Sequence, residues 1–353
     1  MRNFVATQKC LVFFLVTLLL TISVHSTSYG QGRNKIYWTE VDWKTKTGKI
    51  RRAHLDGSYV KDIVKRLKAP KAIALDMLRR KVYWTDESTH KIQSADLTGR
   101  NVKDLVIGFK FPTGSGTLSI RCGDGKCTGV ADWKEGEMWL SEDLLIDPHH
   151  LAVDIQREKI YWINRMLDRI QRANLDGSDV EDLVTWAFSD ALTLDRNRGK
   201  IYWTDYSMNA IRRANLDGSN VETVVTTMDD PVSLALDVAR GKIYWTEWER
   251  GFDGPRTIQR ANLDSSNVEY ILTSPDKLMS LALDPVGGKI YWITSESATY
   301  TGKIQRSNLD GSKVENIITG LNNPRSIALD FPGVHVTPSI DKLTTTWAKV
   351  KTE

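Results

Sequence analysis

Six Tyr-Trp pairs recur along the chain, and this repeat restricts the possible folds more than any other feature. The pairs begin at Tyr37, Tyr83, Tyr161, Tyr202, Tyr244 and Tyr291. Successive pairs lie 41 to 47 residues apart, except for one interval of 78. A period of this length is typical of the four-stranded blades of β-propellers. The long interval equals one period plus an insertion, which we place at residues 107–144.

Each repeat unit contains four short segments with the composition of strands. They are an apolar run ending in Asp (LALD), a KIYWTD-like segment, a segment like IQRANLDGS and a β-branched run such as VEDLV. Gly, Asp, Asn and Pro separate them, which is typical of strands joined by turns. In the LDGS turn we expect Asp to bond to its own backbone and Gly to supply a positive φ.

The KIYWT segment is apolar on both faces, so its strand needs neighbours above and below. We therefore interpret the six Tyr-Trp pairs as packing between blades. The repeats begin with a KIYWT strand at residues 35–39 and end with an IALD strand at residues 327–330, so the first blade is complete only if these two strands pair. The sequence predicts an all-β, six-bladed propeller at residues 33–330 with four-stranded antiparallel blades, closed by its terminal strands.

The two ends of the chain differ from the repeat. Arg2 and Lys9 precede an apolar run at residues 11–24, and small and polar residues follow this run. This layout predicts a secretory signal peptide at residues 1–30, and the run is short for a membrane span; a retained anchor is the alternative. We expect a secreted chain, extracellular or periplasmic, whose mature form does not span a membrane. Residues 331–353 form a tail with the pattern of an amphipathic helix.

The charge of the chain gives no sign of a nucleic-acid partner. It has 48 basic and 44 acidic residues, and the signal segment contains two of the basic residues and no acidic one. The mature chain therefore has 48 − 2 = 46 basic residues, for a net charge of +2. Positive and negative residues are interspersed rather than clustered, so the electrostatic basis for binding nucleic acid is missing.

From about Lys35 to Asp330 the chain resembles the YWTD, or class B, repeat of the low-density lipoprotein receptor family. The LALD, KIYWTD and NLDGS segments occur in that family's order, with variation to YWIN at Asn164 and to YWIT at Thr294. The resemblance implies a six-bladed β-propeller that binds proteins or peptides, mostly on one face, without catalysis. We expect a protein or peptide ligand, with carbohydrate as the alternative, and a monomer.

One face of the ring is expected to vary between blades. The LDxxxGK and LDGS turns on the other face are nearly uniform, whereas the connections from the second to the third strand, and from blade to blade, differ. Variable loops on a rigid scaffold often bind ligands. Three long connections, 40–49, 247–257 and 294–303, belong to units that adjoin across the closure, and their aromatic and charged residues are typical of interfaces. The candidate binding residues are Trp43, Asp42, Glu40, Trp248, Glu249, Arg250, Phe252, Glu296 and Tyr300. Alternatively, each aromatic covers its own blade.

The insertion contains CGDGKC, from Cys122 to Cys127, and these are the cysteines that remain after signal cleavage. In an exported chain, two cysteines around a Gly-Asp-Gly turn predict a hairpin with a disulfide. His149 and His150 follow the insertion near the expected channel mouth, where we expect structural or solvated roles.

No cofactor is expected, and no catalytic motif such as GxSxG or HExxH occurs. The second strands end in Glu40, Asp86, Asn164, Asp205, Glu247 and Thr294. A ring of such oxygen groups would suit Ca²⁺ in a propeller hydrolase or lactonase, which is one alternative function. A structural envelope or surface protein is another. We expect these residues instead to bond strand ends and arginines on the third strands: Arg52, Arg172, Arg213, Arg260 and Arg306.

Overall fold

The computed structural model describes residues 34–42, 44–107, 116–123, 126–133, 136–140, 147–227, 229–248, 256–296 and 298–330. The predicted signal peptide and the C-terminal tail lie outside these residues. The described elements are all β-strands, which form six four-stranded antiparallel sheets and one three-stranded sheet. Within the described ranges, no helix has the length and apolar character needed to cross a membrane.

The six four-stranded sheets are the predicted blades. In order from the inner to the outer strand, blade 1 contains β27 (Pro324–Asp330), β1 (Lys35–Asp42), β2 (Thr47–His54) and β3 (Lys61–Leu67). Blade 2 contains β4 (Pro70–Asp76), β5 (Lys81–Asp86), β6 (Lys91–Asp96) and β7 (Lys103–Ile107). Blade 3 contains β11 (Pro148–Asp154), β12 (Lys159–Asn164), β13 (Arg169–Asn174) and β14 (Glu181–Thr185).

The remaining blades follow the same order. Blade 4 contains β15 (Leu192–Asp195), β16 (Lys200–Asp205), β17 (Ala210–Asn215) and β18 (Glu222–Thr226). Blade 5 contains β19 (Asp230–Asp237), β20 (Lys242–Trp248), β21 (Arg256–Asn262) and β22 (Glu269–Ser274). Blade 6 contains β23 (Lys277–Asp284), β24 (Lys289–Ser295), β25 (Thr301–Asn308) and β26 (Glu315–Asn322).

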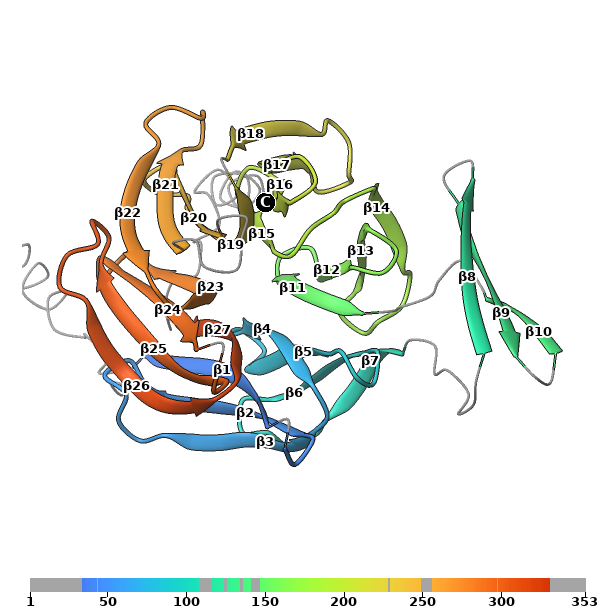
Figure 1. Cartoon of the computed structure of the whole chain (residues 1–353), viewed down its shortest axis with the longest axis horizontal. Helices are drawn as coiled ribbons and strands as arrows, with labels where there is room; N and C mark the ends of the chain where they lie inside the picture. Colours follow the sequence, from blue (N-terminus) through green and yellow to red (C-terminus); the bar gives the residue numbers. More distant parts are fainter. Residues whose placement is uncertain are drawn as a thin grey trace, which may run out of the picture. The chain divides into compact units, whose positions relative to one another are not determined.

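The inner strands pack against one another in sequence and close a ring (Figure 1). Each of β27, β4, β11, β15, β19 and β23 contacts the next, and β23 contacts β27 again. The first blade is completed by the pairing of β1 with β27, in which Trp38 lies opposite Ile327. Across this closure the Ser326 amide donates to Thr39 Oγ1 at 3.1 Å. The prediction of a six-bladed ring closed by its terminal strands is confirmed.

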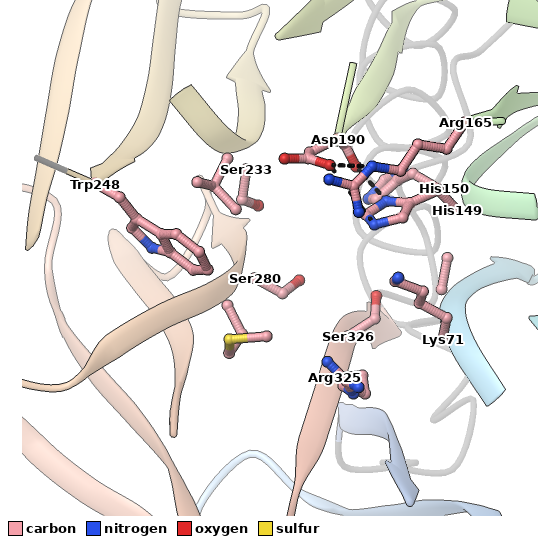
Figure 2. A pocket seen from close by; sticks show the side chains of 13 residues that line it. Lys71, His149, His150, Arg165, Asp190, Ser233, Trp248, Ser280, Arg325 and Ser326 are labelled. Atoms are coloured by element: carbon pink, nitrogen blue, oxygen red, sulfur yellow. Dashed lines mark hydrogen bonds and ion pairs between the residues drawn. The ribbon is translucent and has the colours of Figure 1, made fainter. Parts of the chain in front are cut away.

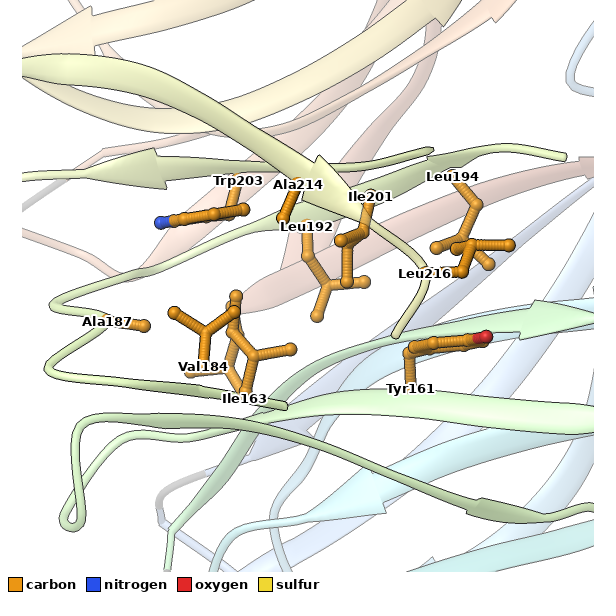
Figure 3. Close-up of a cluster of buried hydrophobic side chains, with 11 residues drawn as sticks. Tyr161, Ile163, Val184, Ala187, Leu192, Leu194, Ile201, Trp203, Ala214 and Leu216 are labelled. Carbon is orange, nitrogen blue, oxygen red and sulfur yellow. The ribbon is translucent and has the colours of Figure 1, made fainter. Parts of the chain in front are cut away.

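The Tyr-Trp pairs form the contacts between blades. Six buried clusters each contain the Tyr of one blade and the Trp of the next, as Tyr161 and Trp203 do in Figure 3. The cluster of Trp38 with Tyr291 joins the last blade to the first. All twelve rings are at most 1% exposed. Because burying one large apolar side chain contributes about 2 kcal/mol, these rings account for much of the interaction that holds the blades together.

The third-strand arginines also join blades, and here the prediction from sequence is wrong. The five predicted arginines do not bond the ends of the second strands; Arg51 and Arg212, on the third strands of blades 1 and 4, bond Glu40 and Asp205 instead. In five blades the arginine's Nη1 donates to the Leu carbonyl of the NLDGS segment, or its equivalent, in the next blade, as Arg213 donates to Leu263 O at 3.2 Å. In four of them the arginine's Nε also bonds a glutamate of the outer strand. The planar guanidinium can serve both partners because its donors point in fixed, separate directions.

The LDGS turn has a further role in contacts between blades. Its Asp accepts the amide of the residue two positions later, as Asp217 does from Ser219, and its Gly has a φ near +80°, so both expectations are confirmed. A methyl group on Gly177 would also lie less than 3.0 Å from the carbonyl oxygen of Leu105, in the preceding blade. Glycine at position 177 therefore suits both the backbone conformation and the close approach of a neighbouring strand, whereas in blade 5 Ser265 holds the equivalent place with a φ of 74°.

The insertion contains a three-stranded antiparallel sheet of β8 (Gly116–Gly123), β9 (Lys126–Trp133) and β10 (Gly136–Leu140). The register of β8 with β9 places Cys122 opposite Cys127. This pairing is compatible with a disulfide across the hairpin, which stays a prediction.

Candidate binding site

One position of the inner strands differs in all six blades. In each blade, one residue of the inner strand pairs with the Trp of the second strand. The position in question is two residues earlier, near the start of the inner strand. The six residues are Lys71, His149, Asp190, Val232, Met279 and Arg325. Elsewhere the inner strands repeat nearly the same motif, so this position is free of the constraint that keeps the blades alike.

These six residues line a cavity of about 190 Å³ at the centre of the ring. Arg165, which follows β12, and Trp248, which ends β20, contribute to its wall. Figure 2 shows the indole of Trp248 on one side of the cavity and Arg165 and Lys71 on the other. Because the inner strands begin here and the second strands end here, the cavity opens on the face that carries the variable connections. We call it the axial pocket.

The axial pocket has an apolar side. Val232, Met279 and Trp248 come from blades 5 and 6 and lie next to one another in the ring order. The Trp248 Nε1 donates to Leu278 O at 3.0 Å, and Lys277 Nζ lies 5.8 Å from the centroid of its ring. The indole is thus fixed with its orientation set by the neighbouring inner strand, as a preorganised surface for ligand contact requires.

The other side is charged. Lys71, Arg165 and Arg325 line it together with the single carboxylate of Asp190. Arg165 Nε lies 3.5 Å from Asp190 Oδ1, and Lys71 Nζ lies 3.2 Å from Glu87 Oε2. Burial lowers the pKa of Lys71, although Glu87 opposes this, and burial raises the pKa of Asp190 against the effect of Arg165. These side chains have lost part of their hydration, so a ligand that restores polar contacts to them is favoured.

Burial favours the neutral form of both histidines of the pocket. His149 Nδ1 lies 3.0 Å from Asp190 O, and the Leu192 amide donates to His150 Nδ1 at 3.5 Å. Burial lowers the pKa of His149 well below its usual value and that of His150 to about 4. Among the residues that the structure describes, no group of three or more His, Cys, Asp or Glu side chains is arranged to hold a metal ion.

The carboxylates that end the second strands serve the fold. Asp86 accepts the amides of Lys68, Ala69 and Thr89, and Asp205 accepts the amides of Ser207 and Met208. Their lone pairs therefore bond the connecting loops instead of a shared site. The amides that Asp86 and Asp205 bond lie in the loops next to the strand ends.

The predicted binding residues fall into separate places. Trp248 lines the axial pocket, whereas Glu40 is buried and accepts the indole of Trp38 at 2.6 Å and the guanidinium of Arg51 at 3.2 Å. Glu40 and Asp42 line a second cavity of about 200 Å³. Glu296 lines a third cavity, of about 450 Å³, beside Lys303 and Asp276.

The closure does bring two of the predicted loops together. The Asn323 amide donates to Tyr300 O at 2.7 Å, and the Asn323 carbonyl accepts from the amide of Val41. Tyr300 is 56% exposed, and Asp42 accepts the amides of Lys44 and Thr45 in a turn. The four remaining candidates, Trp43, Glu249, Arg250 and Phe252, lie outside the described residues.

Sequence reasoning missed an aromatic cluster on the same face. Trp186 and Phe188 belong to the connection from β14 to β15, and their ring centroids lie 6.5 Å apart. The ring of Tyr206, which follows β16, lies 6.0 Å from that of Phe188. The guanidinium of Arg165 lies 6.0 Å from the Tyr206 ring. We call Trp186, Phe188 and Tyr206 the aromatic track. A comparison of outer-strand ends would have found it, because Trp186 occupies the place that Gly320 occupies in blade 6.

Comparisons with known proteins agree with this architecture. Three stretches of the chain, residues 80–108, 199–238 and 288–331, match the low-density lipoprotein receptor repeat class B. A human relative, low-density lipoprotein receptor-related protein 5-like protein, is 28% identical over 163 residues, which is 42% of this chain. The chain spans about 62% of the length of that relative.

Solved structures share the fold at low identity. A chain from a nidogen/laminin complex has a TM-score of 0.62 at 19% identity and covers 84% of this chain and 98% of its own. TolB from Acinetobacter baumannii has a TM-score of 0.58 at 15% identity, covering 85% and 67%. A Bacteroides uniformis protein assigned as a 6-phosphogluconolactonase has a TM-score of 0.51 at 14% identity, covering 84% and 100%.

The closed ring of four-stranded blades, with a pocket at its axis, makes this chain a six-bladed β-propeller. Enzymes and binding proteins share that architecture, so the fold by itself does not decide between them. Three stretches of the ring match the low-density lipoprotein receptor repeat class B, and the KIYWTD and NLDGS segments of the other blades resemble that repeat.

Proposed function

We propose that this chain is an exported, non-enzymatic module that binds a protein or peptide through the variable face, with the axial pocket at the centre of the contact. The observation that carries the proposal is the divergence of one position in six otherwise similar inner strands. Selection for packing would make the six residues alike, as it does for the Tyr-Trp pairs. Six different side chains around one cavity instead provide an asymmetric surface suited to one ligand.

The similar proteins support this assignment. The chain shares class B repeats with a receptor-related protein, and it shares its fold with a chain solved in a nidogen/laminin complex. The apolar residues at the N-terminus favour export. The axial pocket also has the chemical composition of a recognition site, with an indole and aliphatic side chains on one side and a few charged groups on the other.

The test uses a phage library of random 12-residue peptides selected on the intact mature chain. We expect enriched peptides whose affinity falls at least tenfold for Trp248→Ala. The control is Val286→Ala, which removes an apolar side chain that is 84% exposed in the uniform turn between β23 and β24. Val286→Ala should bind as the unsubstituted chain does. If no peptide is enriched, or if both variants bind equally well, the proposal is wrong.

The metal-dependent hydrolase remains the competing function, since a lactonase-like structure shares the fold. Calcium discriminates between the two. A binding module of the proposed kind keeps its melting temperature in EDTA and releases no heat on titration with Ca²⁺. A Ca²⁺-dependent rise in melting temperature of several degrees, as mass action requires for a tightly bound ion, would favour the hydrolase.

A further inference from the structure

Trp186 has a backbone conformation that is costly for its residue type. Its φ is 59°, in the left-handed region that favours glycine. The residue lies at a bulge. Val184 and Thr185 pair with Ile170 and Arg169, and the next ladder bond joins the Ala187 amide to Asp168 O. Trp186 is therefore the extra residue of the outer strand. A non-glycine residue in this conformation costs on the order of 1 kcal/mol.

The same bulge occurs in two other blades and shows what the position requires. Gly320 occupies it in blade 6 with a φ of 68°, and Arg66 occupies it in blade 1 with a φ of 62°. Glycine and a solvated arginine both serve the fold there, so the bulge itself has no need of an indole. The Trp186 side chain is also 63% exposed, which means that burial does not offset its backbone cost.

The turns bonded to the connection that holds Trp186 contain exposed methionines. Met166 and Met208 are 50% and 57% exposed, and they lie in the two turns that flank the connection from β14 to β15. Those turns are held to the connection by the bond from Ala187 N to Asp168 O and the bond from Tyr206 N to Phe188 O. Exposed methionines beside aromatic rings adapt their shape to different apolar side chains.

The aromatic track leads from the rim to the axial pocket. The connection that holds it runs from the outer strand β14 to the inner strand β15 and reaches Asp190, which lines the pocket. Arg165 belongs to both places, since it contacts the Tyr206 ring and lies 3.5 Å from Asp190. The steps between the rings set an upper limit of about six extended residues, at roughly 3.3 Å each, between Trp186 and the pocket.

We propose that the aromatic track is a second subsite for the peptide that the axial pocket binds, a proposal that rests on the function proposed above. The occupant is an extended segment of a partner protein. One apolar side chain of the segment lies against Trp186 and its neighbouring methionines. A carboxylate within about six residues of it enters the charged side of the pocket, where Lys71, Arg165 and Arg325 face a single lining carboxylate.

The test compares two substitutions at equivalent bulges, with synthetic peptides made from the sequences that the phage selection enriches. Trp186→Gly removes the indole and relieves the left-handed φ, so we expect an equal or higher melting temperature together with at least a tenfold loss of affinity. Arg66→Gly relieves the same conformation on another blade, and we expect it to leave affinity unchanged. Trp186→Phe should retain most of the affinity.

The carboxylate is tested on the ligand. Replacing the acidic residue of a selected peptide by its amide should weaken binding to the unsubstituted chain at least tenfold, and should have much less effect on binding to Lys71→Met. Equal affinity of Trp186→Gly and the unsubstituted chain, or enriched peptides without an apolar residue near an acidic one, would overturn the second subsite. Loss of binding in Trp248→Ala would then still support the proposed function, whereas a library that yields no peptide contradicts both.

Discussion

At the scale of the residue, the repeat separates positions that serve packing from positions that are free to differ. The Tyr-Trp pair and the LDGS glycine are nearly invariant within the chain because they contact the next blade. The six inner-strand residues that line the axial pocket share no contact that recurs from blade to blade, and no two of these six are the same. Residues that repeat in every blade therefore identify the buried interfaces. The one inner-strand position that differs in every blade identifies the candidate site.

The first prediction concerns that glycine. Gly177→Ala should lower the free energy of unfolding by about 3 kcal/mol or more, because the methyl group would meet Leu105 O in addition to the cost of a positive φ. Gly241→Ala is the matched control, since its φ is 63° and nothing lies within 4 Å of the added Cβ. It should cost about 1 kcal/mol. Urea denaturation measures both, and equal losses would show that contact with the neighbouring blade has no role.

The second prediction concerns His150. Its pKa falls to about 4 in the folded chain from about 6.5 in the unfolded chain, so the unfolded state binds the extra proton first. The stabilisation due to the neutral ring is complete above pH 6.5 and is lost as the pH falls towards 4. His150→Asn retains an acceptor for the Leu192 amide but has no proton to gain. Its stability should therefore depend less on pH in this window, as thermal denaturation at several pH values would show; equal slopes would contradict the expectation.

At the scale of the element, adjacent blades are joined by an arginine that one blade lacks. Blade 2 has Ser94 where the others have arginine, and Lys103 lies opposite it where four blades have glutamate. Without the guanidinium as partner, burial raises the pKa of Tyr83 to about 12. The interface between blades 2 and 3 therefore lacks the arginine bond found at the other five, although Arg79 and Glu158 form an ion pair across it.

Restoring the missing pair should strengthen that interface. We expect Ser94→Arg combined with Lys103→Glu to raise the free energy of unfolding by about 1 kcal/mol. This is the contribution of a hydrogen bond made by a charged group, reduced because the side chains are partly exposed to solvent. Ser94→Arg alone places two cations opposite each other and should stabilise less or destabilise. Chemical denaturation of the two variants and the parent decides, and a single variant as stable as the double one would refute the argument.

At the scale of the molecule, the ring and its closure could be predicted from the sequence because repetition averages over many residues. Six matching motifs outweigh one irregular loop. The site could not be predicted as well, because the direction of a single side chain decides it. The sequence predicts Trp248 at a binding sector beside the closure, whereas its indole donates to Leu278 O and lines the axial pocket. Glu40 is likewise predicted as a binding residue, but it lies buried in β1 and its Oε1 accepts from Trp38 and Arg51.

The closure gives the fourth prediction. A chain that ends at Asn323 lacks β27 and leaves β1 without its inner neighbour, so we expect the whole ring to melt at a lower temperature in one transition. A chain that ends at Asp330 is the control, because both chains lack the tail. Calorimetry distinguishes them. Equal melting temperatures would mean that β27 does not contribute to the cooperative unit, and a second, independent transition would mean that blade 1 unfolds alone.

The pairing of β1 with β27 also determines the order in which the blades can be completed during synthesis of the chain. Thr39 and Ser326 are 287 residues apart, so the first blade to leave the ribosome is the last to be completed. Until residue 330 is available, β1 presents an open edge to any other chain nearby. Contacts over so long a sequence separation also form slowly. A ring closed in this way therefore depends on β1 remaining unpaired until the last strand of the chain has been made.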